Sequence, residues 1–376
     1  MVNSDNCCGC GACSNICGKN AITIQEDENG FIVPAIDTDK CVECHACESV
    51  CPRINNPINF HQQQSFYAAY HNSVEVRNSS SSGGMFTAIS DYVLDHNGAV
   101  VGVIQNPDLT LTMGIAITKE QRDQFKKSKY VQCRTNDIYL DIRDRLHKGQ
   151  LVLFTGVPCQ VSALRLFLKR EYENLICVDI LCHGIPSESV FLDYIKYKEK
   201  KANHKIVKYN FRDRHSSLGW KKTVFSAKYE DGSVEKIDGR FDYYYGLFYR
   251  NVAHRSSCFT CMHKTKERVG DITLGDFWGV DDLIPGIDTY NGVSLLIVNS
   301  NKGSNILNAI KNTITCVPCD ISAKIPQTMT ENNPPYKFRD SFFRMRKKNG
   351  FAYACFFHVF LFRLAMKMHL IKKNYR

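Results

Sequence analysis

The chain has 376 residues, of which 44% are hydrophobic, with a formal net charge of +10 and 18 cysteines. This length suggests two or three domains with a sizeable core. Its polar, cysteine-rich start, MVNSDNCCGC, does not resemble a secretory signal. Since disulfide scaffolds belong to oxidising compartments, so many cysteines indicate metal or redox chemistry in a cytoplasmic protein.

Charge is distributed unevenly along the chain. Residues 1–60 contain eight acidic and three basic residues, a net −5, and residues 336–376 contain one acidic and eleven basic residues, a net +10. An acidic head and a basic tail suggest different partners at the two ends. Nucleic acid is a poor explanation, because no recognition motif accompanies the basic residues.

The first sixty residues contain two identical cysteine runs. The spacing C-x2-C-x2-C-x3-C occurs at Cys7, Cys10, Cys13 and Cys17, and again at Cys41, Cys44, Cys47 and Cys51. Three thiolates of such a run bind one 4Fe–4S cubane and the fourth comes from the other run, so Cys51 is expected to complete the first cluster and Cys17 the second. Zinc sites, typically built from two C-x2-C pairs, do not account for triple runs.

This region resembles the bacterial two-cluster 4Fe–4S ferredoxins over about sixty residues. It departs from them at Gly18, where a proline usually follows the fourth cysteine, which affects loop stiffness more than ligation. Cys8 is an additional cysteine, which we expect to be a bystander rather than a ligand. We assign residues 1–57 to this domain and the polar stretch 58–65 to a linker.

A serine- and glycine-rich turn precedes the first helix expected after the linker. In SSSSGGMFTAISDYVLDHNGAVVGV, apolar residues from Met85 to Val93 follow the helical period, Asn97-Gly98 ends the helix, and residues 99–104 form a buried strand. Such a turn is either a phosphate site at a helix N-terminus or an ordinary N-cap with flexible glycines. No GxGxxG or Walker pattern decides between the two.

The next segments predict a parallel sheet. Residues 151–154 and 175–181 are nearly continuous apolar runs separated by a helical pattern, as in strands covered on both faces. Strand–helix–strand connectivity brings the loops after both strands to one sheet edge, where open α/β sheets bind ligands. Those loops contain Cys159 and Cys182. Further on, a β-hairpin is expected around Asp231-Gly232 and a short strand at residues 271–274.

A further pair of cysteines lies at Cys258 and Cys261. Together with Cys159 and Cys182, they supply the four thiolates that a third 4Fe–4S cluster requires. A structural zinc ion would take the same ligands, and packed, inert thiols are the remaining alternative. Two clusters upstream favour iron.

Five blocks in order resemble the coenzyme F420 hydrogenase/dehydrogenase beta-subunit family: SSGGMF, KSKYVQC, TGVPCQVSAL, VDILCHGIPS and CFTCMHKTKERVGDITLGDFWG. The resemblance covers about residues 66–300 and implies an α/β fold that holds FAD beside a 4Fe–4S cluster. Members include subunits that reduce or oxidise the deazaflavin coenzyme F420, and a reductase of a chlorophyll derivative. The expected fold class is therefore α/β (α+β overall): a two-cluster ferredoxin module, a flavin-binding α/β domain with a partly parallel sheet, and a C-terminal helical tail.

The resemblance also implies site residues. The flavin-side cluster would be held by Cys159, Cys182, Cys258 and Cys261, with Cys133 as a substitute ligand because many relatives carry serine there. His183 would donate a proton, hydrogen-bond the flavin edge or only shape its turn. The flavin pocket would be formed by Ser82, Gly83, Gly84, Lys129, Tyr130, Gly156, Pro158, Gly184, Asp271, Thr273, Gly275 and Asp276, with Phe277 and Trp278 packing its wall.

These features predict an iron–sulfur flavoprotein oxidoreductase. Clusters carry single electrons and a flavin pairs them, so electrons would pass between a redox carrier or partner oxidoreductase and a small-molecule substrate or deazaflavin. An electron-transfer subunit without its own substrate, docked on a partner enzyme, is the alternative from a second class. A metal-stabilised binding protein without turnover is the third.

Residues 301–376 are expected to form a C-terminal extension. Cys316 and Cys319 form an isolated C-x-x-C pair, which favours inert thiols over a redox dithiol. The tail from residue 344 has an apolar body with basic flanks. It is expected either to pack on the domain or to lie on an anionic membrane at the cytoplasmic face.

Overall fold

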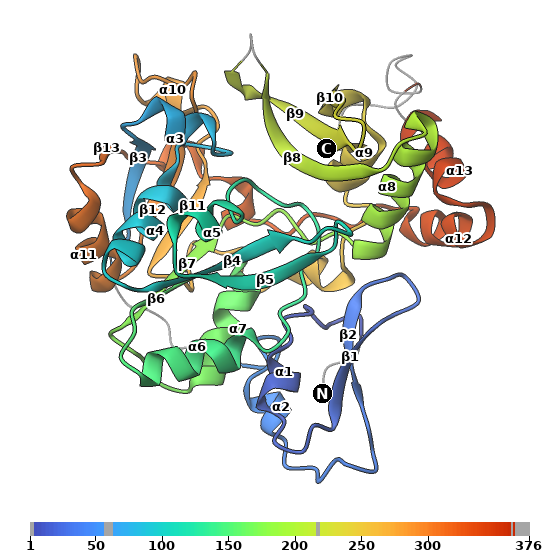
Figure 1. Ribbon diagram of the computed structural model, residues 1–376, viewed down its shortest axis with the longest axis horizontal. Coiled ribbons are helices and arrows are strands. Elements are labelled where there is room, and N and C mark those ends of the chain that lie inside the picture. Colours follow the sequence, from blue (N-terminus) through green and yellow to red (C-terminus); the bar gives the residue numbers. More distant parts are fainter. Residues whose placement is uncertain (1–3, 56–62, 216–218, 362–363, 365–376) are drawn as a thin grey trace.

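The computed structural model describes residues 4–55, 63–215, 219–361 and 364. Most of the predicted linker, and the end of the tail, lie outside these residues. The chain forms an N-terminal module, a large domain around a mixed sheet, and a smaller antiparallel sheet with C-terminal helices beside it (Figure 1).

The N-terminal module contains two short helices and one hairpin. Its elements are α1 (Ala12–Ile16), β1 (Ile22–Glu26), β2 (Ile32–Ile36) and α2 (Ala46–Ser49). The two strands pair antiparallel, and each helix lies within one cysteine run. The pseudo-symmetric arrangement expected of a two-cluster module is therefore present.

The large domain is built on an eight-stranded sheet in the order β13-β3-β12-β11-β7-β6-β4-β5. The strands are β3 (Ser65–His71), β4 (Ala99–Gln105), β5 (Leu111–Ala116), β6 (Val152–Gly156), β7 (Leu175–Ile180), β11 (Ile272–Asp276), β12 (Ser294–Val298) and β13 (Ile314–Pro318). The four central strands β4, β6, β7 and β11 are parallel, and the outer pairs are antiparallel. The predicted, partly parallel sheet is confirmed.

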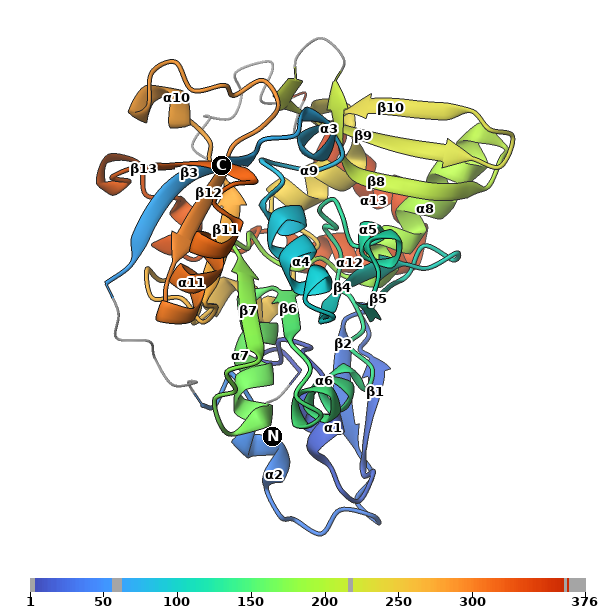
Figure 2. The same ribbon diagram turned by 60° about the vertical axis from the view of Figure 1, so that its left-hand side comes forward.

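Helices cover both faces of this sheet (Figure 2). The surrounding helices are α3 (Val74–Asn78), α4 (Met85–Asp95), α5 (Lys119–Asp123), α6 (Ile138–His147), α7 (Pro158–Leu168), α10 (Val280–Leu283) and α11 (Asn301–Ile310). Along β6, Leu153 packs into the same core as α4 and α11, whereas Val152 and Phe154 pack with α6 and α7. Because alternate strand residues point to opposite faces, a continuous apolar run is needed to fill both cores.

A second sheet lies over the edge of the first. It contains β8 (Ile206–His215), β9 (Gly219–Tyr229) and β10 (Val234–Asp238) in antiparallel order, with the predicted turn between β9 and β10. It packs on α8 (Glu188–Ala202) and α9 (Tyr243–Tyr249) through buried rings that include Phe191 and Phe211.

The C-terminal segment packs on the protein as far as the structure describes it. It contains α12 (Arg339–Asn349), α13 (Phe351–Cys355) and a turn of π-helix (Phe356–Phe360). Phe342, Phe351 and Val359 are buried in the main core. None of the helices in the described ranges is long and apolar enough to cross a membrane.

Candidate functional site

A cavity of about 1000 Å³ opens at the carboxyl ends of the parallel strands. Its wall includes Thr155 and Gly156 at the end of β6, Leu181 after β7, and Gly275 in β11. This is the sheet edge where α/β folds bind ligands, and the volume lies at the upper end of the range for cofactor sites. Nine of the predicted flavin-pocket and catalytic residues line it: Ser82, Gly84, Lys129, Tyr130, Gly156, His183, Gly184, Gly275 and Asp276.

Four predicted contacts are not among the lining residues. Gly83 packs against two strands, since a Cβ there would lie 2.5 Å from the carbonyl oxygen of Ala69. Pro158 is buried in the first turn of α7. The Asp271 carboxylate is buried, where it accepts hydrogen bonds from the backbone N–H of Cys177 and the hydroxyl of Ser300, both at 2.8 Å.

Thr273 is the fourth of these contacts, and it belongs to a buried ion-pair network. Its hydroxyl donates to Asp179, which pairs with Arg268 at 2.8 Å. All three side chains are buried. The motif at β11 contains both buried structural residues and cavity-lining residues. The sequence alone therefore could not show which of them would contact a ligand.

The serine–glycine turn leaves the N-terminus of α4 without a side-chain cap. Gly84 is the N-cap residue, with φ +86°, and no side chain accepts a hydrogen bond from the first turn. Ser82 donates to the carbonyl of Val293 at 3.0 Å, which fixes the turn at the cavity wall. An uncapped helix end beside a cavity leaves backbone N–H groups available to an anion, so the geometry favours the phosphate alternative over the ordinary N-cap.

Lys129 lines the cavity, and its ammonium is bonded to backbone carbonyls. Its ammonium donates to the carbonyl oxygens of Gln124, Phe125 and Lys126 at 3.2, 2.8 and 3.0 Å. Three acceptors match the three N–H bonds of an ammonium. Burial lowers the pKa of Lys129 to about 7. The ammonium therefore holds the turn that follows α5 at the cavity wall.

His183 lies at the cavity between aromatic rings. Its ring is 5.1 Å from that of Phe248 and 5.3 Å from that of His254, and Asn333 donates to its backbone carbonyl at 2.7 Å. Burial, with a smaller contribution from Lys264, lowers the pKa of His183 to about 4. A neutral imidazole can donate or accept one hydrogen bond at each nitrogen but carries no extra proton at neutral pH.

The four cysteines expected to hold the flavin-side cluster come together. Cys159 lies in the first turn of α7, Cys182 follows β7, and Cys258 and Cys261 lie in and after a 3-10 turn at Ser256–Thr260. Burial raises the pKa of Cys182 to about 12 and that of Cys258 to about 11, and in both cases Cys261 adds to the effect. Cys159 is affected by both Cys182 and Cys261.

Two further features suit an anionic group at this position. The backbone N–H of Ile185 donates to the sulfur of Cys258 at 3.4 Å, and hydrogen bonds to sulfur are typical of iron–sulfur sites. The ammonium of Lys264, whose residue is 7% exposed, has no hydrogen-bond partner in the described ranges. A buried cation of this kind needs an anion beside it.

The first ferredoxin cluster site is also enclosed. The expected ligands of the first cluster, Cys7, Cys10, Cys13 and Cys51, line one small cavity together with Cys8 and with Cys47 of the second run. Burial raises the pKa of Cys7 to about 11 and that of Cys13 to about 12. Across the described residues, no three His, Cys, Asp or Glu side chains are arranged to hold a metal ion.

The second set is closer to solvent. Cys44 is exposed, and Cys17, Cys41 and Cys47 are half-buried. The backbone N–H of Ala21 donates to the sulfur of Cys17 at 3.4 Å.

The N-terminal module is fastened to the large domain at its first cysteine run. Arg255, 1% exposed, donates to the carbonyls of Cys7 at 3.0 Å and Ile32 at 2.6 Å. Tyr139 donates to the carbonyl of Cys10 at 2.8 Å. The inner end of the module therefore faces the flavin-side cysteines, and the second set faces away from this interface.

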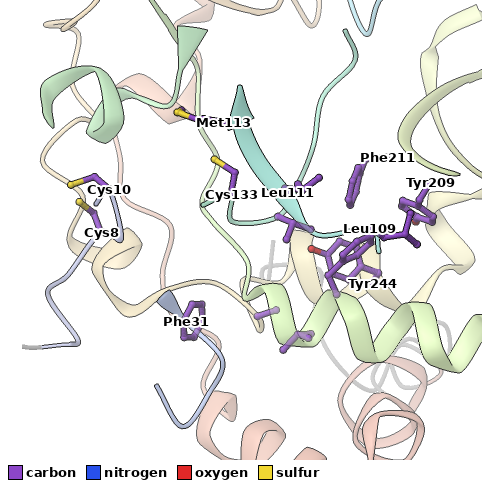
Figure 3. Close-up of a cluster of buried hydrophobic side chains, with 14 of the residues drawn as sticks. Cys8, Cys10, Phe31, Leu109, Leu111, Met113, Cys133, Tyr209, Phe211 and Tyr244 are labelled. Atoms are coloured by element: carbon purple, nitrogen blue, oxygen red, sulfur yellow. The ribbon is translucent and has the colours of Figure 1, made fainter. Parts of the chain in front are cut away.

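Cys8 lies where the two modules meet. Its thiol forms hydrogen bonds with both Cys10 and Cys159, which lowers the pKa of Cys8 well below its usual value. Figure 3 shows Cys8 and Cys10 together at one end of the core cluster that continues to Tyr244. In the sequence, Cys8 stood out only as a cysteine outside the repeated spacing. Its neighbour in the large domain, Cys159, is distant in sequence and could not be inferred.

The remaining cysteines do not join these sets. Cys133 accepts a hydrogen bond from Gln160 at 3.2 Å and lines the cavity. Cys316 and Cys319 belong to different core clusters, on opposite faces of the sheet. This separation agrees with inert thiols rather than a dithiol.

An aromatic platform at the cavity escaped the sequence analysis. Trp220 and Trp278 stack with ring centroids 4.4 Å apart and an angle of 7°. Arg212 lies 4.9 Å above the Trp278 ring and pairs with Asp276 at 2.8 Å. Trp220 and Arg212 come from the small sheet, outside every motif block, so only the fold brings them to the cavity.

Comparisons with known proteins identify both parts of the chain. Residues 149–324 match the family described as the C terminus of the coenzyme F420 hydrogenase/dehydrogenase beta subunit, and residues 6–54 match the 4Fe-4S dicluster domain. A chain of the F420-reducing [NiFe] hydrogenase complex from Methanosarcina barkeri is similar at 15% identity, covering 80% of this chain and 90% of that chain, with a TM-score of 0.45. No curated protein matches. The chain is thus an electron-transfer protein that contains a 4Fe-4S dicluster domain and a region similar to a family of oxidoreductase beta subunits.

Proposed function

We propose that this chain, which joins a 4Fe-4S dicluster domain to a domain of the coenzyme F420 hydrogenase/dehydrogenase beta-subunit family, is an iron–sulfur flavoprotein oxidoreductase. The observation that carries the proposal is the Cys10–Cys8–Cys159 contact, which joins the first ferredoxin site to the flavin-side site. Cys182 continues that line, since it belongs to the flavin-side set and also lines the cavity. Electrons would enter at the exposed second set and end in the cavity.

The cavity residues fit a flavin nucleotide. FAD, when bound, exchanges electrons singly with clusters and in pairs with an organic substrate. The uncapped N-terminus of α4 would hold its phosphates, with Ser82 and Gly84 at the turn. Tyr130, Gly156 and Gly275 would line the remaining wall.

His183 would serve as a neutral hydrogen-bonding group. Its carbonyl is held by Asn333 and its ring by Phe248, so its orientation is fixed. Because burial keeps the pKa of His183 low, the imidazole would orient the bound ring system rather than deliver a stored proton. The substrate would be a small organic molecule or a deazaflavin.

An electron-transfer subunit that docks on a partner enzyme is the alternative. The observation that favours it is an exposed aromatic face on the C-terminal helices, formed by Tyr353, Phe356, Phe357 and Phe360. Exposed apolar patches of this kind mark interaction surfaces. Peripheral contact with an anionic membrane is a second use of the same face, because the chain beyond it is basic.

Anaerobically purified protein tests the proposal. We expect about twelve iron atoms per chain, four for each of three clusters, with FAD released by acid. Reduction of an organic acceptor by the isolated chain would favour the enzyme, and reduction only in the presence of a partner would favour the docking subunit. Protein with eight iron atoms and no flavin would refute the proposal. Release from anionic liposomes after removal of residues 365–376, which leaves the buried Phe351 and Val359 in place, tests the membrane contact.

A further inference from the structure

Lys264 is a buried lysine whose charge is not balanced by any contact described so far. Its ammonium is buried beside the flavin-side cysteines, and its electrostatic neighbours are Cys182, Cys261 and Cys258. Lysine is almost never buried without a partner, because removing an ammonium from water is expensive. Within the described residues, however, its Nζ makes no hydrogen bond.

Two buried cations elsewhere in the described ranges have carboxylate counterions, and the buried Arg255 bonds to neutral carbonyl oxygens. Arg268 pairs with Asp179 at 2.8 Å, and Lys198 pairs with Glu235 at 2.6 Å. The side chains around Lys264 are thiols instead. In the described ranges no carboxylate pairs with the ammonium of Lys264, so the surrounding side chains supply no anion to balance it.

An iron–sulfur cluster would supply that anion. A 4Fe–4S core with four thiolates carries two negative charges when oxidised and three when reduced, all within the space that Lys264 faces. Under the proposed function, such a cluster would accept one electron from the ferredoxin side and pass it on toward the cavity. No bond is made or broken, so the charge of the site changes by one at each step.

We infer that Lys264 is the charge-compensating residue of the flavin-side cluster, and that its ammonium stabilises the reduced state and raises the reduction potential. The inference rests on the proposed function, under which a cluster binds there. Charge close to a cluster is one of the factors that set its potential. The buried ammonium favours the state with three negative charges over the state with two.

Variants of Lys264 test the inference through the reduction potential of the flavin-side cluster, not through activity. In Lys264→Met, we expect the ratio of reduced to oxidised flavin-side cluster at a fixed potential to fall about tenfold, which is about 59 mV for one electron. The measurement is a redox titration of the full chain followed by EPR, with the two ferredoxin signals as internal references. Lys264→Arg should keep the wild-type potential, because it keeps the charge.

Lys266 provides the matched control. It lies two residues away in the same loop and is exposed. Lys266→Met removes the same charge but, because solvent screens it, should leave all three potentials unchanged.

A second measurement gives an effect of opposite sign. Without the cluster, the unpaired ammonium destabilises the fold, so iron-free Lys264→Met should melt at a higher temperature than iron-free wild type. A lower melting temperature in the variant would contradict the inference. So would an unchanged potential in Lys264→Met that still holds about twelve iron atoms.

Iron content separates this inference from the proposed function. Wild-type protein with only the eight ferredoxin iron atoms would refute both. Loss of the third cluster from Lys264→Met but not from Lys264→Arg would support the need for charge. Loss from both variants would show that the loop needs the shape of lysine, and would overturn the inference.

Discussion

The two ends of the cysteine series differ in burial. The second ferredoxin set, represented by exposed Cys44, is close to solvent, whereas Cys182 and Cys258 at the other end are enclosed enough for burial to raise their pKa values to about 12 and 11. An exposed set can exchange electrons with an external protein. A buried set must be reached through the protein and needs internal compensation of its charge, which we infer comes from the unpartnered ammonium of Lys264.

Removing a ligand from the buried set should have the largest effect. Cys182→Ala leaves three thiolates around a charge that the protein interior cannot otherwise stabilise. We expect iron content to fall from about twelve to about eight atoms per chain, and electron transfer from a protein donor to the cavity to fall by about 100-fold.

Cys133→Ala is the control for that loss. Cys133 is buried and close to the cavity, but its sulfur accepts from Gln160 and is not grouped with the flavin-side cysteines. Iron content should stay at the wild-type value. Loss of four iron atoms from Cys133→Ala would instead make it a ligand, the alternative that the sequence left open.

Separating the two modules should have the next largest effect. Arg255→Met removes three hydrogen bonds from a buried guanidinium to Cys7, Ile32 and Gln132. Since each bond to a charged group contributes about 1.5–3 kcal/mol, we expect the free energy of unfolding to fall by about 3 kcal/mol or more.

Arg53→Ala is the comparison for the module interface. Arg53 also crosses it, donating to the carbonyl of Thr260 at 2.8 Å, but this contact is exposed. Its loss should change the free energy of unfolding by less than about 1 kcal/mol. Denaturant titrations of both variants measure the difference, and equal losses would mean that burial does not decide the strength of the interface.

The rate at which a chelator removes iron should also distinguish the exposed cysteine set from the two enclosed sets. A chelator under mild oxidation reaches the exposed second set before the two enclosed sets. We expect about four iron atoms to leave in a first phase and about eight in a slower phase. Absorbance and EPR followed together identify the clusters lost, and release of all iron in one phase would contradict the difference in burial.

Much of this arrangement could be predicted from the sequence. Periodicity predicted the central strands, because a strand covered on both faces must be apolar throughout, and cysteine spacing predicted the 4Fe-4S dicluster domain. The contact of Cys8 with Cys159, the platform of Trp220 and Trp278, and the orphaned ammonium of Lys264 were not predictable. Each depends on how distant segments meet, and no local pattern records that.

The smallest expected effect is on the pH dependence of stability, and it comes from His71 in the large sheet. His71 ends β3, its Nδ1 accepts from the backbone N–H of Ser73 at 3.0 Å, and burial lowers its pKa from 6.5. Because the folded state binds this proton less readily than the unfolded state, the stabilisation is complete above pH 6.5 and is lost as the pH falls below it. Thermal melting of iron-free protein should therefore show a larger loss between neutral and mildly acidic pH in wild type than in His71→Gln. Identical pH profiles in the two proteins would mean that His71 takes no part in the acid sensitivity.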